Sequence, residues 1–384
     1  MPNWRAARNA CEPVTLNSTV AIFRKRLLSY SETFIAEQGQ FLPNYRPVFC
    51  GYQKDLSGLH LLESSTTVLL DDYSRVASLS KFLFRQGLGG AGGWCQAIAA
   101  LSPALLHAHF FNDGLDAIKL GKRLKLPVIT TVHGHDITKH ETANAQNETN
   151  RSFFERVDKV IAVSNFIAEQ ALARGCPEHK LVQHYIGIDL EKFAQSKAES
   201  SEPSLLFVGR LVEKKGCTYL LQAMEKLQPR FPELRLTIIG DGGLGPSLQQ
   251  EARSRRLNVD FAGTASAAEI RAQLARCWLF VAPSITAKSG DAEGLGMVFL
   301  EAQALSTPVV SFRSGGLVEA VEEDVTALLS DEKDVPGLAR NIADLLENST
   351  LRHNMGMAGR KRVEQYFDLR AQCAKLESIY AECR

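Results

Sequence analysis

The chain has 384 residues, of which 45% are hydrophobic and 23% are charged, so it can bury a sizeable core and disorder is excluded as its main state. Its 44 Lys and Arg residues against 43 Asp and Glu residues leave a formal net charge of +1, which excludes the basic field of a nucleic-acid-binding protein. No apolar run reaches the roughly 18 residues that span a bilayer. Because no apolar signal core follows Met1 and eight scattered cysteines form no Cys-x-x-Cys pair, we expect reduced thiols in a cytoplasmic protein.

Short apolar runs alternate with longer helical patterns along the whole chain, which predicts a parallel α/β architecture. Two series of predicted strands are separated by a polar segment, EKFAQSKAESSEPS, at residues 191–204. The strands are expected at residues 19–23, 67–70, 105–108, 128–132 and 160–163, and then at 205–208, 234–239, 259–261, 278–282 and 308–312. We therefore expect a first domain over residues 1–190, a linker over 191–204, a second domain over 205–367 and a terminal helical segment over 368–384.

Residues 74–93, SRVASLSKFLFRQGLGGAGG, predict an amphipathic helix with Val76, Leu79 and Leu83 on one face. An interfacial membrane helix is one interpretation of that face. Because the stretch holds only three basic residues, packing of the apolar face on the domain's own sheet is the preferred interpretation.

The segment 290–303, GDAEGLGMVFLEAQ, is the most informative for chemistry. Its glycines at positions 294 and 296 precede a predicted helix, where the backbone can approach a ligand and free N–H groups favour an anion such as a diphosphate. Glu293 and Glu301 flank this position, and carboxylates beside a diphosphate are suited to accept hydrogen bonds from sugar and ribose hydroxyls. A solvated first helical turn with a cap is the structural alternative.

A second loop, within FVGRLVEKKG at residues 207–216, places Arg210 and Lys215 just after a predicted strand. Two such cations can close over a diphosphate and stabilise the negative charge that grows as a nucleotide leaves, which removes the need for a divalent cation. A solvated loop is the alternative interpretation. The glycines at residues 240–243 lack the spacing of a dinucleotide fingerprint, so a nicotinamide cofactor is not expected.

Four side chains of types that bind zinc, His133, His135, Asp136 and His140, lie within eight residues. They directly follow the predicted strand at 128–132, and catalytic loops gather at such strand ends. A His133 that contacts substrate is therefore preferred over a metal site and over purely structural histidines. His107 and His109 alternate with apolar neighbours, and we interpret them as core histidines.

In combination, the segments GRLVEKKG, IIGDGG and PSITAKSGDAEGLGMVFLEAQA resemble the retaining glycosyltransferases of family 4. The first half supports the resemblance, since YSETFIAEQ, LLHAHF, HGHD, AVSNF and IGID occur in the family's order. Together these segments extend from about residue 20 to residue 367. The SETF and PSITAxxGDxEG variant is similar to enzymes that build bacterial exopolysaccharide or capsule repeat units on a lipid carrier.

The resemblance implies a GT-B fold, in which two Rossmann-like domains face each other across a cleft and a C-terminal helix crosses back to the first domain. It also implies site residues. Arg210 and Lys215 hold the donor diphosphate, and Glu301 holds the ribose hydroxyls. The implied catalytic residues are His133, Glu293, Arg210 and Lys215. The other implied donor contacts are Gly294, Leu295, Gly296 and Met297 at the transferred sugar, and Gly263 and Thr264 at the base. The implied acceptor contacts are Ser31, Glu32 and Thr33. Many relatives carry a glycine-rich first loop, and this chain departs from them there.

The implied activity is transfer of a hexose, with retention and without a metal or other cofactor, from a UDP- or GDP-linked sugar to a glycan hydroxyl. The acceptor would be lipid-linked, as in surface polysaccharide biosynthesis. Transient contact of the first half, through its Arg24-Lys25-Arg26 run and residues 74–93, with the inner face of the plasma membrane would bring the enzyme to that acceptor. The alternatives are a nucleotide-sugar epimerase of the same fold and a non-catalytic sugar- or nucleotide-binding protein.

Overall fold

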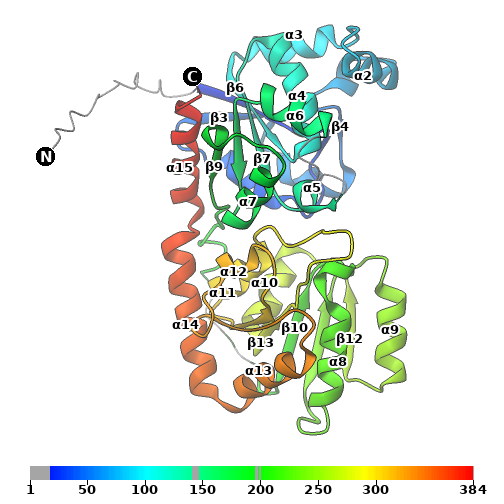
Figure 1. Cartoon of the computed structure of the whole chain (residues 1–384), viewed down its shortest axis with the longest axis vertical. Coiled ribbons are helices and arrows are strands. Elements are labelled where there is room, and N and C mark those ends of the chain that lie inside the picture. Colours follow the sequence, from blue (N-terminus) through cyan, green and yellow to red (C-terminus); the bar gives the residue numbers. More distant parts are fainter. Residues whose placement is uncertain (1–17, 141–146, 195–197, 199, 384) are drawn as a thin grey trace, which may run out of the picture.

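The computed structural model describes residues 18–140, 147–194, 198 and 200–383. Cys11, the start of the chain and part of the expected linker lie outside the described residues. Two α/β domains are stacked along the long axis of the molecule, and the last two helices run along one side of both (Figure 1). The two-domain GT-B architecture expected from the sequence is confirmed.

The first domain is built on a seven-stranded sheet in which every neighbouring pair is parallel. In spatial order its strands are β5 (Thr66–Leu69), β3 (Tyr45–Gly51), β1 (Ser18–Phe23), β6 (Pro103–His109), β7 (Val128–Val132), β8 (Lys159–Ala162) and β9 (Leu181–Gln183). Alternate residues of β1 enter two separate apolar clusters, with Ala21 and Phe23 in one and Val20 and Ile22 in the other. Both faces of the sheet are therefore buried, which is why its strands read as continuous apolar runs in the sequence.

The helices of the first domain connect these strands. They are α1 (Thr33–Gln40), α2 (Ala77–Arg85), α3 (Gly92–Ala100), α4 (Phe111–Leu124), α5 (His135–Thr138), α6 (Glu148–Arg156) and α7 (Asn165–Ala173), with the short helices η1 (Leu56–Leu62), η2 (Leu70–Tyr73) and η4 (Glu178–Lys180). A short parallel pair, β2 (Arg26–Leu27) and β4 (Gln53–Lys54), lies beside the main sheet.

The second domain is built on a six-stranded parallel sheet. In spatial order its strands are β12 (Val259–Gly263), β11 (Arg235–Ile239), β10 (Ser204–Val208), β13 (Leu279–Val281), β14 (Val309–Phe312) and β15 (Ala327–Ser330). Its helices are η5 (Glu213–Lys215), α8 (Cys217–Leu227), α9 (Gly245–Ser254), α10 (Ala267–Arg276), α11 (Met297–Ala304), α12 (Leu317–Ala320), α13 (Val335–Glu347) and α14 (Ser349–Tyr366).

The last helix, α15 (Leu369–Ala381), returns to the first domain, as expected (Figure 1). Its Glu377 carboxylate accepts hydrogen bonds from the backbone N–H groups of Asn44 and Tyr45, at 2.6 and 3.0 Å. The Tyr380 hydroxyl lies 2.7 Å from Nδ1 of His107 on β6. Since Leu369 and Leu376 also enter the cluster on that face of the sheet, α15 closes the first domain's core and ties the two domains together.

Three strands of the two main sheets, β3, β9 and β15, were not predicted, and neither was the short pair of β2 and β4. β3 contains Pro47, which cannot donate to a ladder and disguises a strand in the sequence. β9 and β15 have only three and four residues and lie at sheet edges, where a short run gives little periodic signal.

Candidate active site

Lys215 and Glu293 form an ion pair at the side of the second sheet that faces the first domain. The Lys215 ammonium lies 2.6 Å from Oε2 of Glu293, and both side chains are largely buried. Although burial by itself raises the pKa of this carboxyl, Lys215, Lys214 and Arg210 lower it, to about 2. Glu293 is thus held as a carboxylate by three cations gathered around one point, which is the charge arrangement that a diphosphate needs.

The turn that carries Lys215 is fixed by close backbone packing. Gly216 has φ +65°, and a Cβ added there would lie 1.8 Å from the carbonyl oxygen of Pro283. The Ile285 N–H donates to the Lys214 carbonyl at 2.8 Å, and the buried Lys214 ammonium lies 2.9 Å from Oδ1 of Asp291. Lys214, for which no separate role was predicted, therefore anchors the loop while Lys215 faces Glu293.

The loop from Glu293 to α11 lies directly against the first domain. A Cβ added to Gly294 would be 1.7 Å from the His133 carbonyl oxygen, so only glycine permits this approach. The Ser164 hydroxyl, at the start of α7, donates to the Gly294 carbonyl at 2.6 Å. Thus the predicted His133 and Glu293 loops, 160 residues apart, meet in one place, and Ser164 is a contact that the sequence did not single out.

The remaining second-domain positions lie around this loop. Gly296, at φ +82°, is the N-cap of α11, Leu295 is buried before it, and Met297 is the first residue of the helix. Glu301 follows one turn later; burial and the Glu37 carboxylate of α1 raise its pKa to about 7. A carboxyl with that pKa can accept a hydrogen bond from a hydroxyl in its ionised form and donate one in its protonated form.

Arg210, Gly263 and Thr264 are exposed at the carboxyl ends of strands β10 and β12. A Cβ added to Gly263 would meet nothing within 4 Å, and the Gly263 carbonyl accepts a hydrogen bond from Gly240 N–H at 2.7 Å. The carboxyl-terminal edge of the second sheet is therefore open to solvent beside β11 and β12. An open edge of this kind, at the carboxyl ends of parallel strands, is where ligands bind in α/β folds.

His133 is held by aromatic and histidine rings. Its Nε2 lies 3.0 Å from Nδ1 of the buried His109, and the rings of Phe110 and Phe34 lie 4.5 and 5.1 Å from its own. Burial and the charge of Arg24 hold the pKa of His133 well below its ordinary value, so the ring is neutral at pH 7. His109, expected to be a core residue, is buried as expected but also contacts the predicted site.

Asp136 organises the His133 loop through its backbone. Its carboxylate accepts hydrogen bonds from Gly134 N–H at 2.8 Å, from His133 N–H at 3.1 Å and from Phe111 N–H at 2.9 Å. Three backbone donors occupy this carboxylate, which is typical of a structural role. Within the described ranges, no three His, Cys, Asp or Glu side chains gather in a way that could hold a metal ion.

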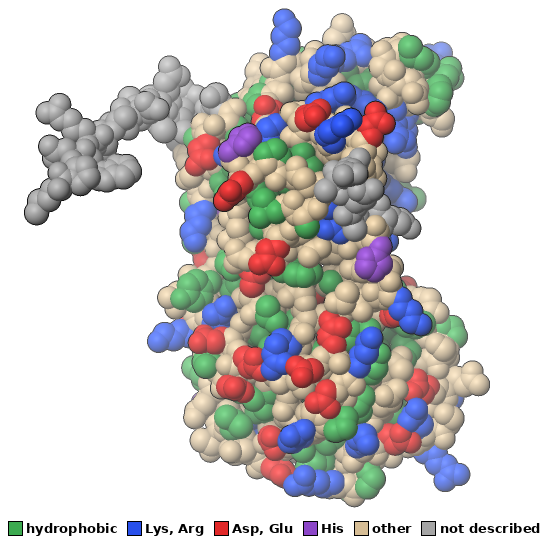
Figure 2. Space-filling view, viewed as in Figure 1, with side chains coloured by type: hydrophobic (Ala, Val, Ile, Leu, Met, Phe, Trp, Pro, Cys, Tyr) green, Lys and Arg blue, Asp and Glu red, His purple; other side chains and the backbone are tan. Residues whose placement is uncertain are grey.

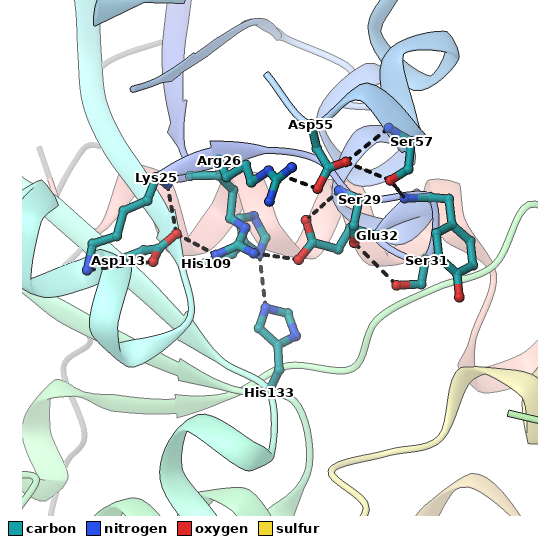
Figure 3. A network of polar contacts seen from close by, with 12 residues as sticks. Lys25, Arg26, Ser29, Ser31, Glu32, Asp55, Ser57, His109, Asp113 and His133 are labelled. Carbon is teal, nitrogen blue, oxygen red and sulfur yellow. Dashed lines mark hydrogen bonds and ion pairs between the residues drawn. The ribbon is translucent and has the colours of Figure 1, made fainter. Parts of the chain in front are cut away.

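The predicted acceptor loop is organised by Arg24, which donates to both Glu32 and Asp113 and lies 4.4 Å above the Phe110 ring. The Ser29 N–H donates to Glu32 Oε2 at 3.2 Å, so the carboxylate is shared between the loop and the arginine. Figure 3 shows Glu32 and Asp113 in one polar network close to His109, with His133 below it.

The other two predicted acceptor residues differ in their surroundings. Thr33 begins α1, immediately after the Glu32 cap. Ser31 is exposed, and its hydroxyl lies 3.3 Å from that of Ser29. The three positions therefore share one edge of the first domain, and Glu32 is the one fixed by charge.

Comparison with protein-family models gives two adjoining matches. Residues 189–362 match the family "Glycosyl transferases group 1", and residues 67–192 match "Glycosyltransferase Family 4". Together they cover most of both domains.

Several curated proteins are similar in sequence. The amylovoran biosynthesis glycosyltransferase AmsK of Erwinia amylovora is 30% identical over 277 residues, covering 71% of this chain and 68% of the relative. A GDP-mannose-dependent alpha-(1-6)-phosphatidylinositol monomannoside mannosyltransferase of Mycolicibacterium smegmatis is 28% identical over 376 residues, covering 93% and 94%. WcaL of Escherichia coli, named for colanic acid biosynthesis, is 31% identical, and the chain spans 60% of its length.

Among solved structures, that of Anabaena Alr3699/HepE in complex with UDP and glucose superposes with a TM-score of 0.75 at 18% identity, over 94% of this chain and 99% of the other. At that identity the likeness supports the fold. The family matches and the relatives, added to the two facing Rossmann-like domains, establish that the chain belongs to the glycosyltransferases of family 4.

Proposed function

We propose that this glycosyltransferase moves a hexose from a nucleotide-diphosphate sugar to a hydroxyl of a lipid-linked glycan, with retention and without a metal ion, during assembly of a surface polysaccharide. The observation that carries the proposal is the buried Lys215–Glu293 pair at the start of α11, 2.6 Å apart. The names of the exopolysaccharide relatives support the acceptor class.

Binding of the donor would divide that pair between two partners. The diphosphate takes the charge of Lys215 and Arg210, together with the N–H groups at the start of α11. Glu293 is then free to accept hydrogen bonds from hydroxyls of the transferred sugar. In this arrangement the cations replace the divalent metal that other transferases use.

In the reaction the bond between the anomeric carbon and the diphosphate oxygen breaks, and a bond from the same carbon to the acceptor oxygen forms on the same face. The acceptor's proton passes to the departing phosphate oxygen, so no protein nucleophile is needed. Lys215 and Arg210 stabilise the charge that grows on that oxygen. Neutral His133 faces the reacting centre as a hydrogen-bonding group and as part of the wall that excludes water.

The donor base is either uracil or guanine, since one relative is named for GDP-mannose and one structural neighbour holds UDP. A panel of UDP- and GDP-hexoses, incubated with a short-chain lipid diphosphate sugar in the presence of EDTA, tests the proposal. We expect one donor to release its nucleotide only with acceptor present and to give a product of unchanged anomeric configuration.

Three results would overturn this function or part of it. An isomerised donor without nucleotide release would indicate the epimerase, and complete loss of transfer in EDTA, restored by a divalent cation, would refute metal-free transfer. Tight binding without turnover of any donor would favour a binding protein.

A further inference from the structure

Helix α2 presents its apolar side to solvent. Val76, Leu79, Phe82 and Leu88 are 60, 54, 57 and 70% exposed. The expectation that this face packs on the domain's own sheet is wrong for Val76 and Leu79, while Leu83 is half-buried; the residues that α2 buries are Ser80 and Phe84. In Figure 2 apolar and basic side chains gather at the upper right of the first domain, where α2 lies in Figure 1.

The helix is nevertheless held firmly in place. The Phe84 ring packs against Trp94 and Tyr52, with centroids 5.6 and 6.3 Å away. The Ser80 hydroxyl lies 2.7 Å from that of Ser74, and the Lys119 ammonium donates to the Arg85 carbonyl at 2.6 Å. The exposed face is therefore a fixed feature of the fold, and neighbouring exposed apolar side chains rimmed by polar residues commonly mark an interaction site.

The charge around this face favours one kind of partner. Between positions 74 and 93 the three charged residues, Arg75, Lys81 and Arg85, are all basic. Arg85 is paired with Asp116 at 3.2 Å, so Arg75 and Lys81 supply the positive charge here, with the exposed Asp71 and Asp72 just before the helix. An anionic partner with an apolar interior complements such a surface, and a bilayer with acidic headgroups has both properties. A second copy of the chain is a less suitable partner. In a twofold dimer formed through this patch, these cations would face the same cations of the other copy and repel them.

We propose that α2 with its flanking residues 73–88 docks the enzyme on an anionic lipid surface, with Leu79 and Phe82 entering the headgroup boundary. The proposal rests on the proposed function, because a lipid-linked acceptor gives the enzyme a reason to meet a bilayer. Among the described residues no helix is both long and apolar enough to cross a membrane, so the contact is peripheral.

The docking helix is linked to the predicted acceptor loop by one buried carboxylate. Asp116 on α4 pairs with Arg85 of α2 at 3.2 Å and with Lys25 at 3.3 Å. The neighbouring residue, Arg24, holds Glu32. A chain of ion pairs thus connects α2 with the Arg24–Glu32 contact of the predicted acceptor loop.

Vesicle flotation tests this surface directly. The full chain is mixed with vesicles of phosphatidylcholine alone or with phosphatidylglycerol added, and bound protein is measured for the wild type and for Leu79→Ser/Phe82→Ser. Both positions are exposed and outside the catalytic machinery, so folding and basal transfer stay unchanged. The control is Val325→Ser/Met357→Ser, which removes similarly exposed apolar side chains from the second domain.

We expect binding to the anionic vesicles only, a loss of about tenfold or more in the α2 variant, and none in the control. Equal binding by the wild type and the α2 variant, or none by the wild type, would overturn the proposal. A concentration-dependent dimer that the α2 variant abolishes, seen by analytical ultracentrifugation without vesicle binding, would assign the patch to a second copy and overturn it as well.

The same variants separate this inference from the enzyme's chemistry. Transfer to a short acceptor that is free in solution should be equal in the wild type and in Leu79→Ser/Phe82→Ser, while transfer to acceptor in anionic vesicles should fall in the variant alone. Failure of both enzymes to transfer in solution would refute the proposed function, and vesicle binding would still decide the docking surface.

Discussion

The Lys215–Glu293 pair offers the sharpest test of the active site, because stability and catalysis are expected to respond differently to its removal. Lys215→Met leaves a buried carboxylate without its nearest cation, which costs stability. Replacing Glu293 as well, in Lys215→Met/Glu293→Gln, removes the orphaned charge. If Lys215 also holds the diphosphate, the double variant recovers stability and not activity.

The pKa of Glu293 gives the size of the effect. The fall of the pKa from 4.5 to about 2 already includes the opposing effect of burial, and it corresponds to a net stabilisation of the ionised carboxyl of about 3 kcal/mol. Lys215 is the nearest of the surrounding cations, at 2.6 Å. We therefore expect Lys215→Met to lower the free energy of unfolding by about 2 kcal/mol at neutral pH. Loss of one preorganised charge at the leaving group should lower kcat by about 10²- to 10³-fold.

The pH dependence of stability checks the same interaction. Because the pKa of Glu293 is lower in the folded chain than in the unfolded one, its contribution is complete above about pH 4.5 and is lost as the pH falls towards 2. The difference in unfolding free energy between wild type and Lys215→Met should thus be constant from about pH 5 to 8 and shrink below that range.

Urea denaturation at several pH values and steady-state kinetics of nucleotide release measure both quantities. The reasoning fails if folded Lys215→Met keeps kcat within about threefold of the wild type, or if the double variant is no more stable than the single one. Recovery of activity in the double variant would mean that the pair serves only the fold.

Substitutions at three further positions test the rest of the cleft. His109→Leu removes the partner of His133 Nε2, so kcat should fall about tenfold with donor KM unchanged, and His109→Asn should recover part of it. Because the pKa of Glu301 is about 7, the fraction of its ionised form increases between about pH 6 and 8. Nucleotide affinity, measured by calorimetry, should therefore increase over that range in the wild type. In Glu301→Gln the nucleotide affinity should not change with pH. Arg24→Ala frees Glu32 and should raise the KM for acceptor while leaving donor hydrolysis unchanged; equal effects on both would contradict the acceptor assignment.

Most of the fold followed from local patterns. Buried strands and amphipathic helices alternate with a regular period, and that period predicts parallel α/β domains without knowledge of which strands pair. Strands β3, β9 and β15 of the main sheets, and the two-residue strands β2 and β4, were missed because a proline or a very short length hides their period.

The candidate site residues could be predicted one by one because parallel sheets gather the carboxyl ends of their strands at one edge. His133 directly follows β7, Arg210 is the second residue after β10, and Glu293 lies in a glycine-containing loop before a helix. The local sequence around each of these three residues was therefore enough to predict its position. The residues that support them, Ser164, His109 and Arg24, have no local signal and act through contacts distant in sequence.

The sequence by itself therefore determined the class of fold, and it predicted which side chains would face a phosphorylated sugar, since both depend on spacing along the chain. Only the tertiary structure decided that Lys215 neutralises Glu293, that His133 lies against Gly294, and that α2 turns its apolar side outward. An amphipathic pattern states that one face of a helix is apolar, and it contains no information about what covers that face. Here Phe84 and Ser80 meet the domain, and packing against Trp94 leaves Leu79 and Phe82 facing solvent.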